Sequence, residues 1–86
     1  MKTLHLHVTF EYFDHIESGE KTEEYREYEK WKSKIEGKQF DAVTIWRGYT
    51  SKKLTRPWRW YCLQLITHKR FKNKTVRVFA IKLEKP

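Results

Sequence analysis

The stretch SGEKTEEYRE, residues 18–27, joins the end of a predicted helix to a short strand that carries charges of both signs. Gly19 ends the helix, because a glycine adopts the left-handed conformation without a steric penalty. Side chains alternate between the two faces of a strand, so Glu24 and Arg26 share one face and Tyr25 points to the other. A salt-bridged strand at a solvated sheet edge would explain this pattern, and so would a site for a polar ligand.

Lys21 stands directly after the Gly19 turn, at the start of this strand. Free backbone N–H groups at the turn and the Lys21 ammonium would meet an anion together, while Arg26 offers a planar fork. Glu24 would stay ionised between the two cations and would orient them or accept a proton. We expect these four residues to border one concave pocket, with Lys21 and Glu24 as the catalytic residues if the protein is an enzyme.

Hydrophobic periodicity on both sides of this stretch predicts two short helices and five strands. The predicted strands are residues 3–10, 21–26, 40–46, 58–71 and 75–83, and the predicted helices are residues 11–19 and 27–37. Residues 47–57 are expected to form a loop. In the last strand the apolar phase changes between Val78 and Phe79, which indicates a bulge or burial on both faces.

These elements predict one α+β domain, residues 1–86, built as a small barrel or a strongly bent sheet with two helices against it. The single cysteine, Cys62, excludes an internal disulfide, and we expect it to be a buried small hydrophobe. We find no signal peptide and no apolar run long enough to span a bilayer. The expectation is a cytoplasmic protein without a membrane partner.

Charge is distributed unevenly along the chain. Residues 1–36 hold six Lys/Arg against nine Asp/Glu, a net −3, whereas residues 37–86 hold thirteen against two, a net +11. A basic half of this kind favours a polyanionic partner, with RNA or a nucleotide first. A solvated surface kept for solubility explains the same charge without a partner.

The predicted loop at residues 47–57 contains four cations and no acidic residue: Arg47, Lys52, Lys53 and Arg56. Such cations repel one another, and a phosphate backbone would relieve the repulsion. The segment RPWRWY, residues 56–61, then interleaves cations with rings, so Trp58 and Arg59 are further candidates for contacts to bases and phosphates. Trp46 is weighed in the same way, against the alternative that small domains bury such rings. Tyr49 is a further candidate for ligand contact.

His5 and His7 share the outer face of the first predicted strand. No carboxylate or cysteine completes a metal-ligand set with them at a recognised spacing. The sequence also lacks a phosphate-binding glycine-rich loop and a dinucleotide fingerprint. We therefore expect neither a metal nor a cofactor.

The stretch SGEKTEEYR resembles the signature of the ASCH domain, a PUA-like family whose pattern is roughly G-x-K-x-x-E-x-R. Gly19, Lys21, Glu24 and Arg26 match that pattern position by position. The preceding YFDHIESG resembles the helix of the family, and WRGY, residues 46–49, resembles a later segment. The resemblance implies a PUA-like barrel, a cleft beside the motif helix, and an RNA- or nucleotide-related function.

Members of that family include proposed RNA binders, ribonucleases, and small amidohydrolases that deacetylate a modified cytidine. The amidohydrolases carry a threonine at the position of Glu24, and a carboxylate cannot supply that hydroxyl group. We therefore expect an RNA- or nucleotide-binding domain. The alternative is a ribonuclease or nucleotide-processing hydrolase, in which Lys21 stabilises the phosphorane and Glu24 or a histidine moves the proton. A third hypothesis is a module whose basic face binds an acidic protein.

Overall fold

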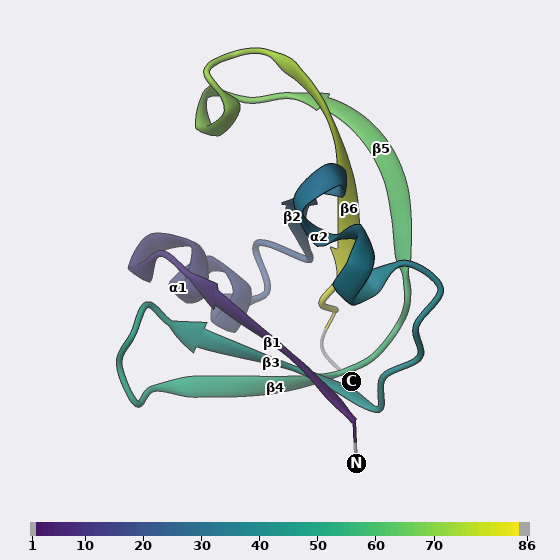
Figure 1. Ribbon diagram of the computed structural model, residues 1–86. Coiled ribbons are helices and arrows are strands. Elements are labelled where there is room, and N and C mark those ends of the chain that lie inside the picture. Colours follow the sequence, from purple (N-terminus) through teal and green to yellow (C-terminus); the bar gives the residue numbers. More distant parts are fainter. Residues whose placement is uncertain (1, 85–86) are drawn as a thin grey trace.

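Six strands form two three-stranded sheets, and together with two helices they give an α+β fold (Figure 1). The computed structural model describes residues 2–84, apart from the side chain of residue 70. The elements are β1 (Thr3–Val8), α1 (Phe10–Ser18), β2 (Glu23–Glu27), α2 (Tyr28–Ile35), β3 (Ala42–Arg47), β4 (Lys53–Pro57), β5 (Tyr61–Thr67), a 3-10 turn η1 (Lys69–Phe71) and β6 (Thr75–Lys82). In the described part of the chain, no helix is long and apolar enough to cross a membrane.

The first sheet has the order β1-β3-β4, with β1 parallel and β4 antiparallel to the central β3. In β1 the leucines and Val8 are buried while His5 and His7 are exposed, as the alternation of the sequence predicts. Residues 42–45 of β3, the central strand of this sheet, are all buried.

The second sheet has the order β2-β6-β5, and both of its strand pairs are antiparallel. Residues 78–81 of the central β6 are buried one after another. Their pairing with β2 and β5 runs without an inserted residue. Of the two alternatives that the sequence left open, burial on both faces is therefore confirmed.

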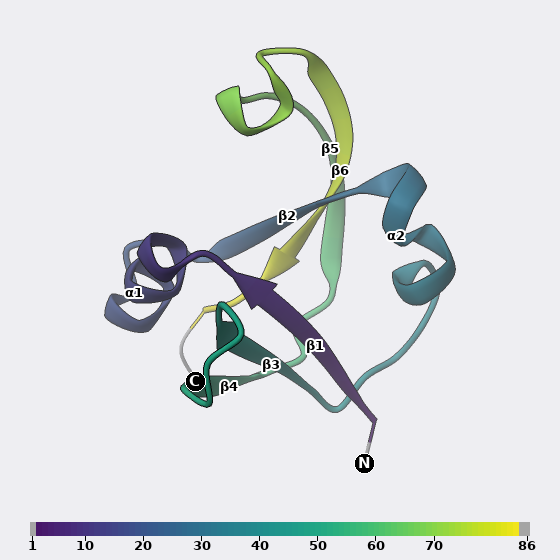
Figure 2. The same ribbon diagram turned by 60° about the vertical axis from the view of Figure 1, so that its left-hand side comes forward.

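The hydrophobic core lies between the two sheets, where both helices contribute to it (Figure 2). Helix α1 buries Phe13 and Ile16, and α2 buries Ile35. Thr9 caps the start of α1, since its hydroxyl accepts a hydrogen bond from the Tyr12 amide at 3.3 Å. This cap ends the first strand earlier than the sequence predicted.

The prediction of a loop over residues 47–57 is wrong in its second half, where β4 pairs with β3. The strand was missed because it has one large apolar side chain, Leu54, among polar residues. It also ends at Pro57, which an edge strand tolerates. The actual turn is short and contains Gly48, whose φ of 58° is left-handed.

The predicted strand over residues 58–71 is shorter in the structure, because its first residues form a corner between the two sheets. Trp60 has a φ of 70°, and its carbonyl accepts a hydrogen bond from the Lys82 amide at 3.2 Å. The hydrogen-bonded pairs of residues 2–84 do not close a barrel. Cys62 is exposed on the edge strand β5, so the expectation that it is buried is wrong.

Leu6 and Leu65 give a matched test of this core, since Leu6 is fully buried and Leu65 is 72% exposed. Leu6→Ala should lower the free energy of unfolding by about 2–5 kcal/mol, because it leaves a cavity. Leu65→Ala should cost under about 1 kcal/mol, as at other surface sites. Urea unfolding followed by circular dichroism measures both, and equal losses would contradict the assignment of the core.

Candidate functional site

The junction between α1 and β2 fixes the first residues of the motif. Gly19 ends α1 with a φ of 91°, and its amide donates to the Ile16 carbonyl. The Lys21 amide then donates to the carbonyl of His15 at 3.0 Å. The left-handed glycine predicted from the sequence is confirmed, and it turns the chain back so that Lys21 lies beside the helix it has just left.

Glu24 is the centre of this site, with 1% of its surface exposed. Its Oε2 lies 2.9 Å from Nη2 of Arg26, and its Oε1 lies 3.6 Å from Nζ of Lys21. The same guanidinium nitrogen of Arg26 donates to the carbonyl of His7 at 2.7 Å. Burial of a charge is costly unless it is paired, so these two cations are what allow the Glu24 carboxylate to be buried.

Aromatic rings hold the two cations. Nζ of Lys21 lies 5.3 Å from the centre of the Tyr12 ring and 5.0 Å from that of Tyr25. The guanidinium of Arg26 lies 5.0 Å from the centre of the Trp31 ring. Cations over ring faces at this distance gain electrostatic stabilisation, and the rings restrict where each cation can move.

Two pockets lie beside the Glu24–Arg26 pair. The first has a volume of about 320 Å³ and is lined by His7, Val8, Thr9, Glu11, Tyr12 and Glu24. The second has a volume of about 270 Å³ and is lined by Arg26, Glu27, Lys30, Trp31 and Phe71. Glu24 and Arg26 therefore belong to the walls of different pockets, whereas Gly19 and Lys21 line neither. The four motif residues lie together. We expected them to border one pocket, and they do not.

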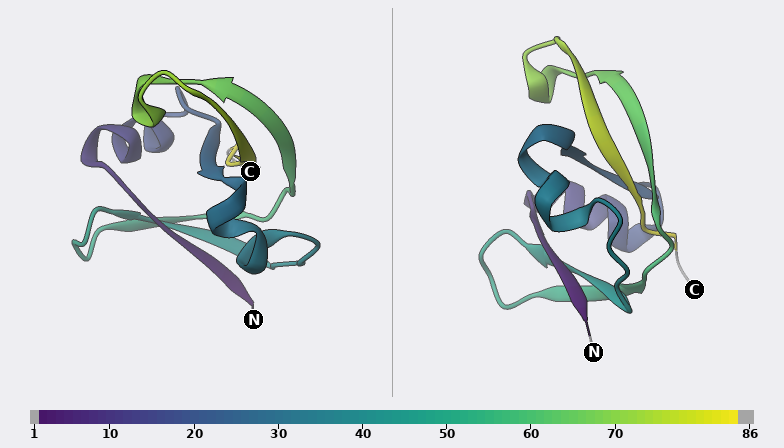
Figure 3. Two further views of the ribbon diagram at one scale, coloured as in Figure 1. Left: turned by 45° about the horizontal axis from the view of Figure 1, so that its top comes forward. Right: turned by 45° about the vertical axis from the view of Figure 1, so that its right-hand side comes forward.

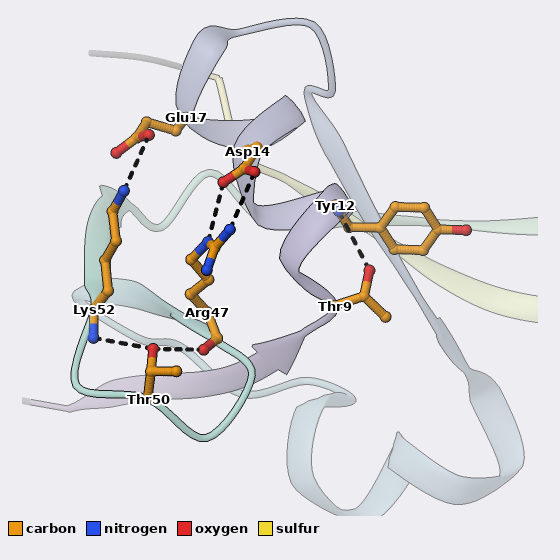
Figure 4. A network of polar contacts seen from close by, with 7 residues as sticks. All are labelled: Thr9, Tyr12, Asp14, Glu17, Arg47, Thr50 and Lys52. Atoms are coloured by element: carbon orange, nitrogen blue, oxygen red, sulfur yellow. Dashed lines mark hydrogen bonds and ion pairs between the residues drawn. The ribbon is translucent and has the colours of Figure 1, made fainter.

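Helix α1 supplies acidic partners to the turn between β3 and β4 (Figure 4). Nε and Nη2 of Arg47 donate to the two oxygens of Asp14 at 3.2 and 3.4 Å, and Nζ of Lys52 lies 3.7 Å from Glu17. The hydrogen bonds from Arg47 hold the pKa of the Asp14 carboxyl below its ordinary value of 3.8. The expectation that these cations have no acid nearby is therefore wrong. Their acidic partners were missed because they are distant in the sequence and become neighbours only in the fold.

The other two cations of this segment differ from each other. Arg56 points inward from β4 and is partly buried, and its Nη2 donates to the carbonyl of Ile16, near the end of α1, at 3.3 Å. Lys53 is exposed, with its Nζ 4.8 Å from the centre of the Trp46 ring. Lys53 is therefore better placed than Arg56 to meet a ligand in solution.

Of the interleaved rings, Trp58 is half-buried and packs edge-on against Phe40, at 4.9 Å between ring centres. It belongs to the partly buried rings around the core, which is the alternative we weighed against ligand contact. Trp60 is 38% exposed, and Arg59 between the two tryptophans is exposed at the corner.

Tyr49 is 92% exposed in the turn after β3. Its ring stacks on His7, with 4.7 Å between ring centres and 19° between planes, and His7 in turn stacks on Trp46 at 5.9 Å. Sequence reasoning missed the part that His7 plays in both this stack and the first pocket. The available signal was its place on the outer face of a strand that ends at the motif helix.

Comparisons with protein-family models, with curated proteins and with solved structures find no match for this chain. The resemblance to the ASCH family therefore depends on the sequence motif alone. In the described part of the chain, no three His, Cys, Asp or Glu side chains gather in a group that could hold a metal ion.

Glu24→Gln should lower the free energy of unfolding by about 3–5 kcal/mol, because it leaves two partly buried cations without their counter-charge. Glu29→Gln is the matched control, since Glu29 pairs with Lys32 at 3.0 Å but is 76% exposed. That change should cost under about 1 kcal/mol. Denaturant unfolding measures both. If Glu24→Gln left the free energy of unfolding unchanged, the carboxylate would not be needed for the fold.

A titration of Asp14 tests the pairing between α1 and β3. The pKa of Asp14 is lower in the folded protein than in the unfolded chain. Asp14 therefore contributes stability at a pH above its pKa in the unfolded chain, and this contribution is lost as the pH falls through its pKa in the folded protein. Arg47→Met should raise the Asp14 pKa back toward its ordinary value, as measured by NMR of the carboxyl carbon. The exposed Arg59 gives the control Arg59→Met, which should leave this pKa unchanged. If the pKa of Asp14 were the same in Arg47→Met as in the unchanged protein, the Asp14–Arg47 pair would be refuted.

Proposed function

We propose that this chain is a single ASCH-type domain, residues 1–86, that binds RNA or a nucleotide at the cleft beside Glu24. The observation that carries the proposal is the burial of the Glu24 carboxylate, in the wall of a pocket, between Lys21 and Arg26. A buried ion pair is weak evidence for stability, because apolar residues of similar size often serve as well. A pocket whose wall contains a few convergent polar groups is the first candidate for a binding site.

The chemistry of the pocket wall suits a nucleobase. Glu11 lines the same pocket with an exposed carboxylate, which can accept hydrogen bonds from the amino and ring N–H groups of a base, as in recognition of the cytosine amino group. Tyr12 also lines this pocket, and aromatic residues are the ones against which unpaired bases pack. The net +11 of residues 37–86 supplies the charge that a phosphate backbone requires.

The finer description of the fold is part of this proposal. A PUA-like barrel in a strongly bent or partly open form fits two three-stranded sheets that meet at the corner of residues 58–60. A cytoplasmic location fits a chain whose one cysteine, Cys62, is exposed and has no second cysteine to pair with.

A ribonuclease or nucleotide-processing hydrolase is the second candidate, because proton-transfer groups gather at the same pocket. His7, Glu11 and Glu24 line it, and Nζ of Lys21 lies 3.6 Å from Glu24. In that case Lys21 would stabilise negative charge on the phosphorus oxygens, and a histidine or carboxylate would move the proton. An acidic protein remains the alternative partner for the basic half.

Lys21→Ala and Arg26→Lys test the binding proposal with single-stranded RNA. Each should raise the Kd about tenfold, or 1.4 kcal/mol, since one loses a charge and the other loses the planar fork. Lys38→Ala is the control, because it removes the same charge at an exposed position. Fluorescence anisotropy gives the Kd, and circular dichroism confirms that each variant is folded.

The same samples distinguish binding from catalysis. Intact RNA after long incubation supports a binding domain, whereas cleavage that Lys21→Ala abolishes with little change in Kd identifies an enzyme. Unchanged affinity in both motif variants, with wild-type protein that binds RNA, would place the binding site elsewhere.

A further inference from the structure

The outer face of the first sheet is a surface that neither helix covers. Both helices and the second sheet lie on the opposite side of β1, β3 and β4, as the two views of Figure 3 and Figure 1 show. Alternation along β1 sends Leu4 and Leu6 into the core and therefore directs His5 and His7 outward onto this face.

Four rings stand in a row on this face. Trp46 is the direct partner of His7 in the register of β1 and β3, and their ring planes differ by 18°. His5 lies on the other side, 6.2 Å from Trp46 between ring centres, and Tyr49 lies 4.7 Å from His7. We call these four residues the ring row.

Hydrogen bonds hold three of the four rings, His5, Trp46 and His7, in place without a ligand. Nδ1 of His7 lies 2.8 Å from the carbonyl oxygen of Gly48, which can only accept, so this nitrogen carries the proton. Nε1 of Trp46 donates to Nδ1 of His5 at 3.2 Å. The rings are therefore already oriented, and a ligand that packs on them loses little affinity to their ordering.

Tyr49 is the exposed end of the row. With 92% of its surface accessible, its ring contributes little to the core, and most of it is open to solvent. Lys53 is exposed over Trp46 at 4.8 Å, so a cation stands beside the rings. Parallel rings with an open end and a neighbouring cation are the arrangement by which single-stranded nucleic acids are held, through stacked bases and paired phosphates.

We infer that the ring row binds unpaired bases of single-stranded RNA. One base stacks on Tyr49 and extends the row, and Lys53 contacts a phosphate nearby. The inference rests on the proposed function and adds the class of ligand, an unpaired oligonucleotide. A duplex would not bind there, because its bases already stack on one another.

The ring row lies next to the first pocket, since His7 belongs to the row and is also one of the residues that line the pocket. A strand that places one base beside Glu24 thus has its neighbouring nucleotides within reach of Tyr49. This continuity gives an oligonucleotide an advantage over a mononucleotide, because the second contact forms within the same complex.

Tyr49→Ala tests the ring row, with Tyr49→Phe as the matched control that keeps the ring. The probe is an oligoadenylate of about ten nucleotides, a length within the usual size of stacking sites. Tyr49→Ala should raise its Kd about tenfold, and Tyr49→Phe should leave it within twofold. An abasic oligomer of the same length should bind more weakly and should not distinguish the variants.

The outcomes separate this inference from the proposed function. If Lys21→Ala weakens binding of the oligoadenylate and Tyr49→Ala does not, the ring row is refuted and the cleft stands. If only Tyr49→Ala weakens it, the ring row stands and the cleft is refuted. Binding of a mononucleotide but not of the oligomer, or Tyr49-dependent binding of polyglutamate with equal strength, would also overturn the inference.

Discussion

The structure depends on the pairing of one buried carboxylate with two cations. Glu24 lies in β2, opposite Ile81 of the central strand β6, where an unpaired charge would be very costly. Arg26 compensates this charge and, with the same nitrogen, binds the His7 carbonyl near the end of β1. One guanidinium therefore joins the two sheets. If the two sheets moved apart, Arg26 would lose the His7 carbonyl, so this hydrogen bond helps to fix how the sheets lie against each other.

The features that follow from neighbouring residues could be predicted from the sequence. The alternation in β1 and the left-handed Gly19 are both confirmed. The pairing of Glu24 with Arg26 was predictable for the same reason, because residues two apart share a face of a strand. Local geometry is set by the chain itself, so one sequence is enough to infer it.

The features that depend on which elements meet in space were not predictable. The acids that pair with Arg47 and Lys52 lie on α1, far from the turn in sequence, so the turn had the appearance of an unpaired basic loop. The edge strand β4 has too few apolar residues to give a clear period, and Arg56 points inward because α1 ends above it. The ring row likewise combines β1 with β3, and no local pattern reveals that the two strands are neighbours.

The parallel pairing of β1 with β3 has a consequence for how the chain folds. Thr3 pairs with Ala42, so the first strand finds its partner only after two helices and another strand have been synthesised. Contacts between residues this far apart require closure of a long loop before they contribute stability, which slows folding. Until β3 is available, the apolar side chains of β1 are exposed to solvent. The histidines at alternate positions interrupt the hydrophobic sequence of β1, which makes this exposed segment less prone to aggregate.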